Sequence, residues 1–146
     1  MGFKPNVIKV DPTALYQPDE DGEDCPDTIC RLLAEVVMPE IDELPFQVLY
    51  SGQPSSAPNY PVNILIGAHV YKRYMQISDK VLVYLMRTDK SVRYALHIKD
   101  GAKAPSVNTL SRFRTRVDQY MEETGISLMD AVMWQVSTKL NEMMQE

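Results

Sequence analysis

The sequence has no long hydrophobic run, and this absence argues against a membrane protein. Charged residues interrupt its longest apolar stretches within about ten residues, far short of the roughly 20 that a bilayer-spanning helix needs. The opening residues, MGFKPNVIKVDP, also lack the apolar core of a secretory signal peptide. We therefore expect a cytoplasmic protein with no membrane partner.

Cysteine, histidine and glycine are all scarce, which leaves little material for a metal or cofactor site. Cys25 and Cys30 have no histidine pair nearby, so their spacing fits neither a zinc site nor a disulfide framework. The two histidines, His69 and His97, lie on different predicted helices, and we expect core or surface roles for both. No Gly-rich phosphate loop, zinc-protease motif or serine nucleophile elbow is present. The sequence thus predicts no cofactor, no small-molecule substrate and no catalytic residue.

The basic residues are concentrated in one part of the chain. Residues 72–116 carry 11 basic and 3 acidic side chains, whereas residues 1–60 carry 3 and 11, and residues 117–146 carry 1 and 6. A basic block of this kind is typical of a phosphate-binding surface. A surface helix pair with solvated lysines would have the same composition, so composition alone leaves both interpretations open.

The pattern beyond residue 26 predicts a single compact all-α domain. Residues 1–26, with several prolines and an acidic run that starts at Asp19, are typical of an extended acidic arm. Residues 27–146 show apolar periodicity and capping residues of helices. Helices are expected over 27–38, 62–76, 79–87, 89–98, 107–124 and 128–144, with an extended piece at FQVLYS. The expected N-caps are Ser78, Thr88, Ser106 and Ser127, and Gly125 is the expected end of the fifth helix.

The segment PSVNTLSRFRTRV, residues 105–117, places three arginines at every second position of a predicted amphipathic helix. Leu110, Phe113, Val117, Tyr120 and Met121 share one stripe, which we expect to be buried. The opposite face carries side chains that suit phosphates and base edges. With the two short helices upstream, this helix would complete a helix-turn-helix-like trihelical unit that binds duplex DNA. The predicted DNA-binding residues are Asn108, Ser111, Arg112, Arg114, Thr115, Arg116, Gln119, Arg93 and Lys103.

Two less specific interpretations stay open beside the DNA interface. In the first, the arginines are only the solvated side of a packed helix. In the second, the last helix carries the function, because its apolar sector is wider than a terminal helix on a small domain needs. That sector indicates either core packing, with methionines filling gaps, or docking to a second copy or to a missing catalytic domain. The candidate docking residues are Met129, Val132, Met133, Val136 and Leu140.

The residues that carry the basic block resemble a known family. YPVNILIGAHVYKRYMQISDKVLVYLMRTDKSVRYAL followed by PSVNTLSRFRTRV resembles the N-terminal domain of InsH-type insertion-sequence transposases, which are bacterial DDE enzymes. PDTICRLLAEVV resembles the first helix of that domain, so the likeness covers about residues 27–120. The most specific part is TLSRFR, residues 109–114, after Pro105. Ser106 stands where the family more often has Asp, and both residues can cap a helix.

The resemblance also implies where the chemistry of such an enzyme resides. The family's three metal-binding acids belong to an RNase H-like domain downstream of the segment that this chain matches. We therefore expect the chain to act as a DNA-binding fragment that recognises element-end DNA and carries out no catalysis itself.

Overall fold

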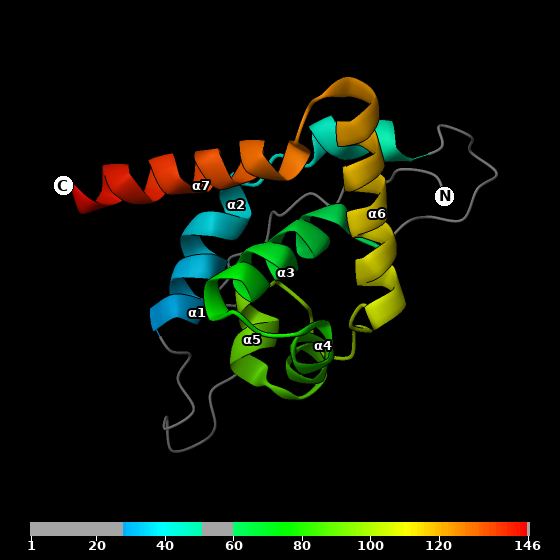
Figure 1. The fold of residues 1–146 in the computed structure, drawn as a ribbon. Coiled ribbons are helices and arrows are strands. Elements are labelled where there is room, and N and C mark those ends of the chain that lie inside the picture. Colours follow the sequence, from blue (N-terminus) through cyan, green and yellow to red (C-terminus); the bar gives the residue numbers. More distant parts are fainter. Residues whose placement is uncertain (1–27, 51–59, 146) are drawn as a thin grey trace, which may run out of the picture.

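The computed structural model describes residues 28–50 and 60–145, and all regular structure within these ranges is helical (Figure 1). The all-α prediction is therefore confirmed. The predicted arm, with its acidic run and Cys25, lies outside the described residues. The elements are α1 (Thr28–Leu32), η2 (Leu33–Val37), α2 (Met38–Glu40), η3 (Leu44–Leu49), α3 (Val62–Met75), α4 (Asp79–Thr88), α5 (Lys90–Ala95), α6 (Val107–Thr124) and α7 (Leu128–Met144).

α1, η2 and α2 follow one another directly as a single helix with a π-helical middle. The predicted end at Met38 is wrong, because the helix continues through Pro39 to Glu40. A proline inside an α-helix clashes with the carbonyl four residues earlier and offers no N–H. The wider π turn accommodates it, and the amide of Met38 donates to the carbonyl of Leu33, five residues back.

The π turn leaves one carbonyl without a donor in its own helix. In the π pattern the carbonyl of Ala34 would pair with the amide of Pro39, which carries no hydrogen. His97 supplies the donor from the end of α5, with its Nε2 2.7 Å from the Ala34 oxygen. Because a carbonyl only accepts, the proton of this imidazole is on Nε2. His97 adopts a left-handed backbone conformation, with φ of 60°.

The predicted extended piece at FQVLYS is wrong, since this stretch lies mainly in the 3₁₀ helix η3. Two local features favour the helical turn over a strand. The Asp42 carboxylate accepts a hydrogen bond from the amide of Leu44 at 3.1 Å, and Pro45 occupies the first turn, where its missing N–H costs nothing. Phe46 is the residue that η3 buries.

α3 is the central helix, as its nearly continuous apolar sequence predicts. Nine of its residues are buried, and the other helices surround it (Figure 1). Its N-cap, Pro61, provides no side-chain acceptor, and the buried Glu43 carboxylate instead accepts from the amide of Asn63 at 3.2 Å. A negative charge at this end also suits the helix dipole. Gly67 allows close packing, because a Cβ there would collide with the sulfur of Met38 and force that buried side chain to move.

Most of the predicted capping residues are confirmed. The hydroxyls of Ser78, Ser106 and Ser127 accept from the backbone of the first turns of α4, α6 and α7. Gly125 ends α6 in the left-handed conformation, with φ of 75°. Thr88 is the exception. It is the last residue of α4, and Asp89 caps α5, where its Oδ1 accepts from the amides of Ser91 and Val92.

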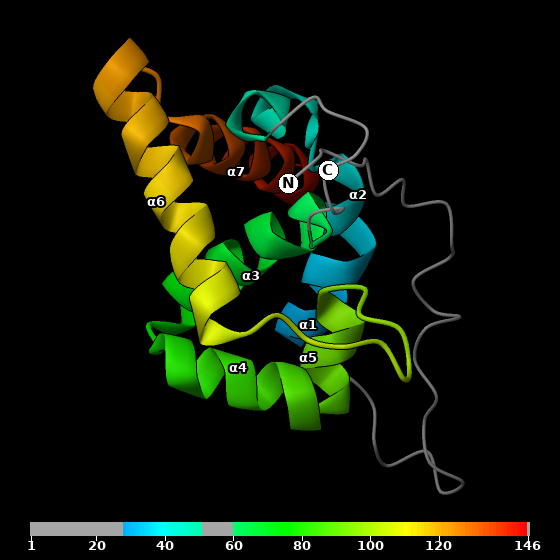
Figure 2. The same ribbon diagram turned by 90° about the vertical axis from the view of Figure 1, so that its right-hand side faces the viewer.

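α6 forms one side of the molecule, and α7 crosses the top of the domain (Figures 1 and 2). α5 and α6 are separated by residues 96–106, whereas only residues 76–78 separate α3 from α4. None of the helices in the described ranges combines the length and the apolar content that a membrane span requires.

Candidate nucleic-acid interface

The outer face of α6 is exposed, polar and free of acidic residues over most of its length. Leu110, Phe113 and Val117 are buried as predicted, whereas Tyr120 is only partly buried. The prediction is wrong for Met121, which is 50% exposed because it lies near the end of α6, where the cavity opens. The opposite side therefore points away from the domain, where α6 stands clear in Figure 2. The first acidic residue of the helix is Asp118. The exposed side chains among the predicted DNA-binding residues of α6 are Asn108, Ser111, Arg112, Thr115 and Gln119.

Arg112 and Arg116 lie one turn apart at the edge of this face. No hydrogen bond or ion pair joins Arg112 to another described residue, so its guanidinium is available to a ligand. Arg116 is half-buried and lies over the ring of Tyr50, 4.8 Å from the centroid. Burial raises the pKa of Tyr50, while its hydrogen bond to Arg116 acts in the opposite direction. Stacking on tyrosine fixes the Arg116 guanidinium at the surface without neutralising its charge.

Arg114, between these two arginines in sequence, faces the interior of the domain. Its two terminal nitrogens donate to both oxygens of Asp79, at 2.9 and 2.6 Å, in a bidentate pair. Lys72 approaches the same carboxylate at 3.1 Å. These donors, Arg114 above all, hold the pKa of Asp79 below its usual value. The pair joins the middle of α6 to the start of α4.

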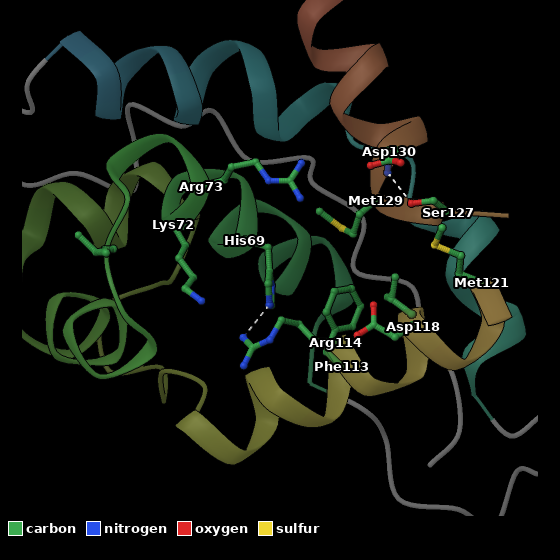
Figure 3. Close-up of a pocket in the computed structure, with 12 residues that line it drawn as sticks. His69, Lys72, Arg73, Phe113, Arg114, Asp118, Met121, Ser127, Met129 and Asp130 are labelled. Atoms are coloured by element: carbon green, nitrogen blue, oxygen red, sulfur yellow. Dashed lines mark hydrogen bonds between the residues drawn. The ribbon is translucent and has the colours of Figure 1, made fainter. Parts of the chain in front are cut away.

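His69 extends this network under α6 (Figure 3). Its Nδ1 lies 2.7 Å from the Leu65 carbonyl and therefore carries the proton, which leaves Nε2 to accept from Arg114 at 3.3 Å. Burial is the main cause that lowers the pKa of His69. The imidazole packs against the Phe113 ring, with 5.3 Å between centroids. His69 and Asp79 thus position α6, a role that their places in the sequence did not indicate.

Arg93 is also occupied within the domain. Its guanidinium donates to three backbone carbonyls, those of Met86, Lys99 and Ala102, at 2.7 to 2.8 Å. Two of these carbonyls belong to the loop that leads into α6. Arg93 was expected to bind phosphate, and the structure instead gives it the role of holding this loop.

The loop into α6 is fixed from a second direction. The Tyr60 hydroxyl donates to the carbonyl of Lys103 at 2.9 Å, and burial raises the pKa of Tyr60 to about 12. Ala104 and Pro105 are buried directly afterwards. The side chain of Lys103, a predicted phosphate contact, is exposed and lies close in sequence to the first turn of α6.

The candidate docking residues on α7 face their own domain. Val132 and Val136 are only 3% and 6% exposed, and the others are partly buried against the same core. The wide apolar sector of α7 is therefore occupied largely by internal packing. The large apolar side chains of this helix that are exposed are instead Trp134, at 71%, and Met143, at 39%. Met129, Met133 and Leu140 are the partly buried members.

A cavity of about 340 Å³ lies where α3, α6 and the start of α7 meet (Figure 3). Phe113, Val117 and Met129 give it apolar walls, and charged side chains of both signs line the rest. Within the described residues, no cluster of three or more His, Cys, Asp or Glu side chains could hold a metal ion.

Comparison with known proteins identifies a family but no individual relative. Neither a curated protein nor a solved structure matches the sequence. A protein family described as a transposase domain (DUF772) matches residues 19–116, which include α1 to α5 and the first half of α6. The match covers about two thirds of the sequence. The chain therefore belongs to the DUF772 transposase domain family.

Proposed function

We propose that this chain is the DNA-binding N-terminal domain of an insertion-sequence transposase of the InsH type, and that it binds element-end duplex DNA with the outer face of α6. The observation that carries the proposal is the exposed, acid-free face around Arg112. Family membership supports a role in transposition. The role assigned to these residues is binding, with no bond-making or bond-breaking step.

The side chains on this face suit both parts of a DNA duplex. Arginine can pair with guanine through two hydrogen bonds or contact phosphate, and asparagine and glutamine can pair in the same way with adenine. Asn108, Arg112 and Gln119 are the candidates for base edges. Ser111 and Thr115 can donate to phosphate, and an α-helix of ordinary diameter fits the major groove.

The charge distribution along α6 supports an orientation on the duplex. Arg112 and Arg116 lie in the first two thirds of the helix, while Asp118, Glu122 and Glu123 lie toward its end. Lys103 adds positive charge ahead of the first turn, where the helix dipole is also positive. The beginning of α6 is therefore expected to lie closest to the phosphates, with its acidic end away from them.

Anisotropy titrations of a random-sequence duplex pool test the proposal. We expect wild-type binding to weaken steeply between about 50 and 200 mM salt. Arg112→Ala is expected to cost about 1 to 3 kcal/mol of binding on selected sequences if Arg112 reads a guanine. Arg112→Ala with Arg116→Ala is expected to abolish binding while the helical circular dichroism is retained.

A matched control separates this local effect from net charge. Arg31 and Lys139 lie on α1 and α7, in ion pairs with Glu35 and Glu40. Replacing both with alanine removes the same two charges, and we expect near wild-type affinity. Absence of wild-type binding at low salt, or equal losses in the two double variants, would contradict the proposal.

A further inference from the structure

A second helix presents a basic surface whose only acidic side chain is already neutralised. The exposed residues Lys80, Tyr84 and Arg87 of α4 are spaced at i, i+4 and i+7, so they form one stripe along the helix. The opposite side buries Leu82 and Met86. Tyr84 is 65% exposed although it is a large aromatic residue.

The two positive charges of this stripe are available to bind a ligand. Among the described residues, no ion pair or side-chain hydrogen bond joins Lys80 or Arg87 to another residue. The one acidic residue of α4 is Asp79, which Arg114 and Lys72 neutralise. A solvated helix face commonly mixes charges of both signs, and this one does not.

The connection between α3 and α4 has the form of a helix-turn-helix. Only Gln76, Ile77 and Ser78 separate the two helices, and Gln76 is in the left-handed conformation with φ of 55°. α4 is seen along its axis in Figure 1, where α3 runs across the view, so the two helices cross. In DNA-binding helix-turn-helix units a short turn fixes the angle between two helices, one of which enters the major groove while the other crosses the phosphate backbone.

The stripe also lies close to the proposed interface. The Asp79–Arg114 pair, with contacts of 2.6 and 2.9 Å, fixes the first residue of α4 beside the middle of α6. Lys80 follows directly. From Lys80 to Arg87 the helix rises about 10 Å, which matches about three base-pair steps of a duplex.

We propose that Lys80, Tyr84 and Arg87 form a second contact surface that binds the phosphate backbone of the same duplex that α6 reads. The proposal rests on the proposed function of α6. Lys80 and Arg87 neutralise phosphates, and the Tyr84 hydroxyl donates a hydrogen bond to a phosphate oxygen. This surface adds affinity that is independent of sequence, while α6 supplies the sequence preference.

The test measures affinity and its salt dependence for two duplexes, a sequence selected by the wild-type protein and a random pool. We expect Lys80→Gln with Arg87→Gln to weaken binding to both by roughly 10- to 100-fold at about 0.1 M salt. The slope of log affinity against log salt is expected to fall by about two. The ratio of the affinities for the selected duplex and the random pool is expected to stay unchanged in this variant, whereas Arg112→Ala is expected to reduce that ratio.

Two further variants complete the design. Arg31→Gln with Lys139→Gln removes the same charge from other helices and is expected to keep the wild-type slope. Tyr84→Phe is expected to weaken binding to both duplexes several-fold, with no change in the slope of log affinity against log salt. An unchanged slope in the α4 variant, or an equal fall in the control, would overturn the inference while leaving the α6 interface intact. Wild-type protein that binds no DNA would overturn both.

Discussion

Arg112 and Arg114 are two residues apart on the same helix and have opposite surroundings. Arg112 is exposed with no partner among the described residues, whereas Arg114 is held by both oxygens of Asp79. Arg116 belongs with Arg112 as an outer arginine, and Arg93 belongs with Arg114 as an inner one. The number of basic residues in a sequence segment therefore does not give the number of charges that a ligand can use, because the fold pairs some of them internally.

The two groups also differ in what the guanidinium does. The inner arginines join parts of the domain that are distant in sequence, so their hydrogen bonds contribute to folding. Of the outer arginines, Arg112 has no partner among the described residues and contributes little to folding, whereas Arg116 stacks on Tyr50 and keeps its charge at the surface. Arginine-to-alanine substitutions should therefore separate into those that lower stability and those that lower DNA affinity.

The largest loss of stability is expected at Arg93. Arg93→Ala removes three hydrogen bonds to backbone carbonyls, and we expect it to lower the free energy of unfolding by about 2 to 4 kcal/mol. Urea unfolding measures the change. Arg93→Lys should recover only part of it, because an ammonium cannot reproduce the planar fork. Unchanged stability combined with a lower salt slope of DNA binding would move Arg93 into the outer group.

The pair between Arg114 and Asp79 should give a smaller effect, because Arg114 is 37% exposed and solvent screens the interaction. A double-mutant cycle of Arg114→Ala and Asp79→Ala is expected to give a coupling of about 1 to 2 kcal/mol. Arg112→Ala, the control on the same helix, should change stability by less than about 0.5 kcal/mol. Strictly additive losses at Arg114 and Asp79 would show that the pair does not stabilise the fold.

The smallest expected effect is a pH dependence of stability that arises from His69, the neighbour of Arg114. Burial lowers the folded-state pKa of His69, so the folded protein favours the neutral ring more than the unfolded chain does. The resulting stability is full above the unfolded value of about 6.5 and is lost as pH falls from there through the folded value. Protonation would also place a positive charge against Arg114. We expect the thermal midpoint to fall more between pH 7.5 and 5.5 in wild type than in His69→Gln, and equal shifts would contradict this role.

Local chemistry predicted much of the fold. Serine caps at Ser78, Ser106 and Ser127 and the glycine stop at Gly125 each depend on a few neighbouring residues, and each appears as expected. The buried stripe of α6 follows from its 3.6-residue period. Where two local signals competed, prediction was less successful. Thr88 and Asp89 can both cap a helix, but Thr88 remains in the last turn of α4, where its hydroxyl donates to the Tyr84 carbonyl, and Asp89 therefore caps α5.

Contacts between distant residues could not be predicted in this way. The helical period places Arg114 beside the buried stripe and Arg112 opposite it, but nothing near Arg114 in sequence identifies its partner Asp79, which is 35 residues away. The three carbonyls that hold Arg93 become available only through the path of the backbone. The exposed face of α6 was therefore predictable as a face, while the division between inner and outer arginines required the structure.

The hydrogen bond from His97 to Ala34 makes two distant positions depend on each other. The carbonyl of Ala34 needs an outside donor only because Pro39 has no amide hydrogen. A relative with another residue at position 39 would be released from the need for a donor at position 97, so the two positions are expected to change together in evolution. In the folded domain, this bond satisfies a buried carbonyl of the N-terminal helix with a donor from the turn after α5, so replacing His97 leaves that carbonyl unpaired.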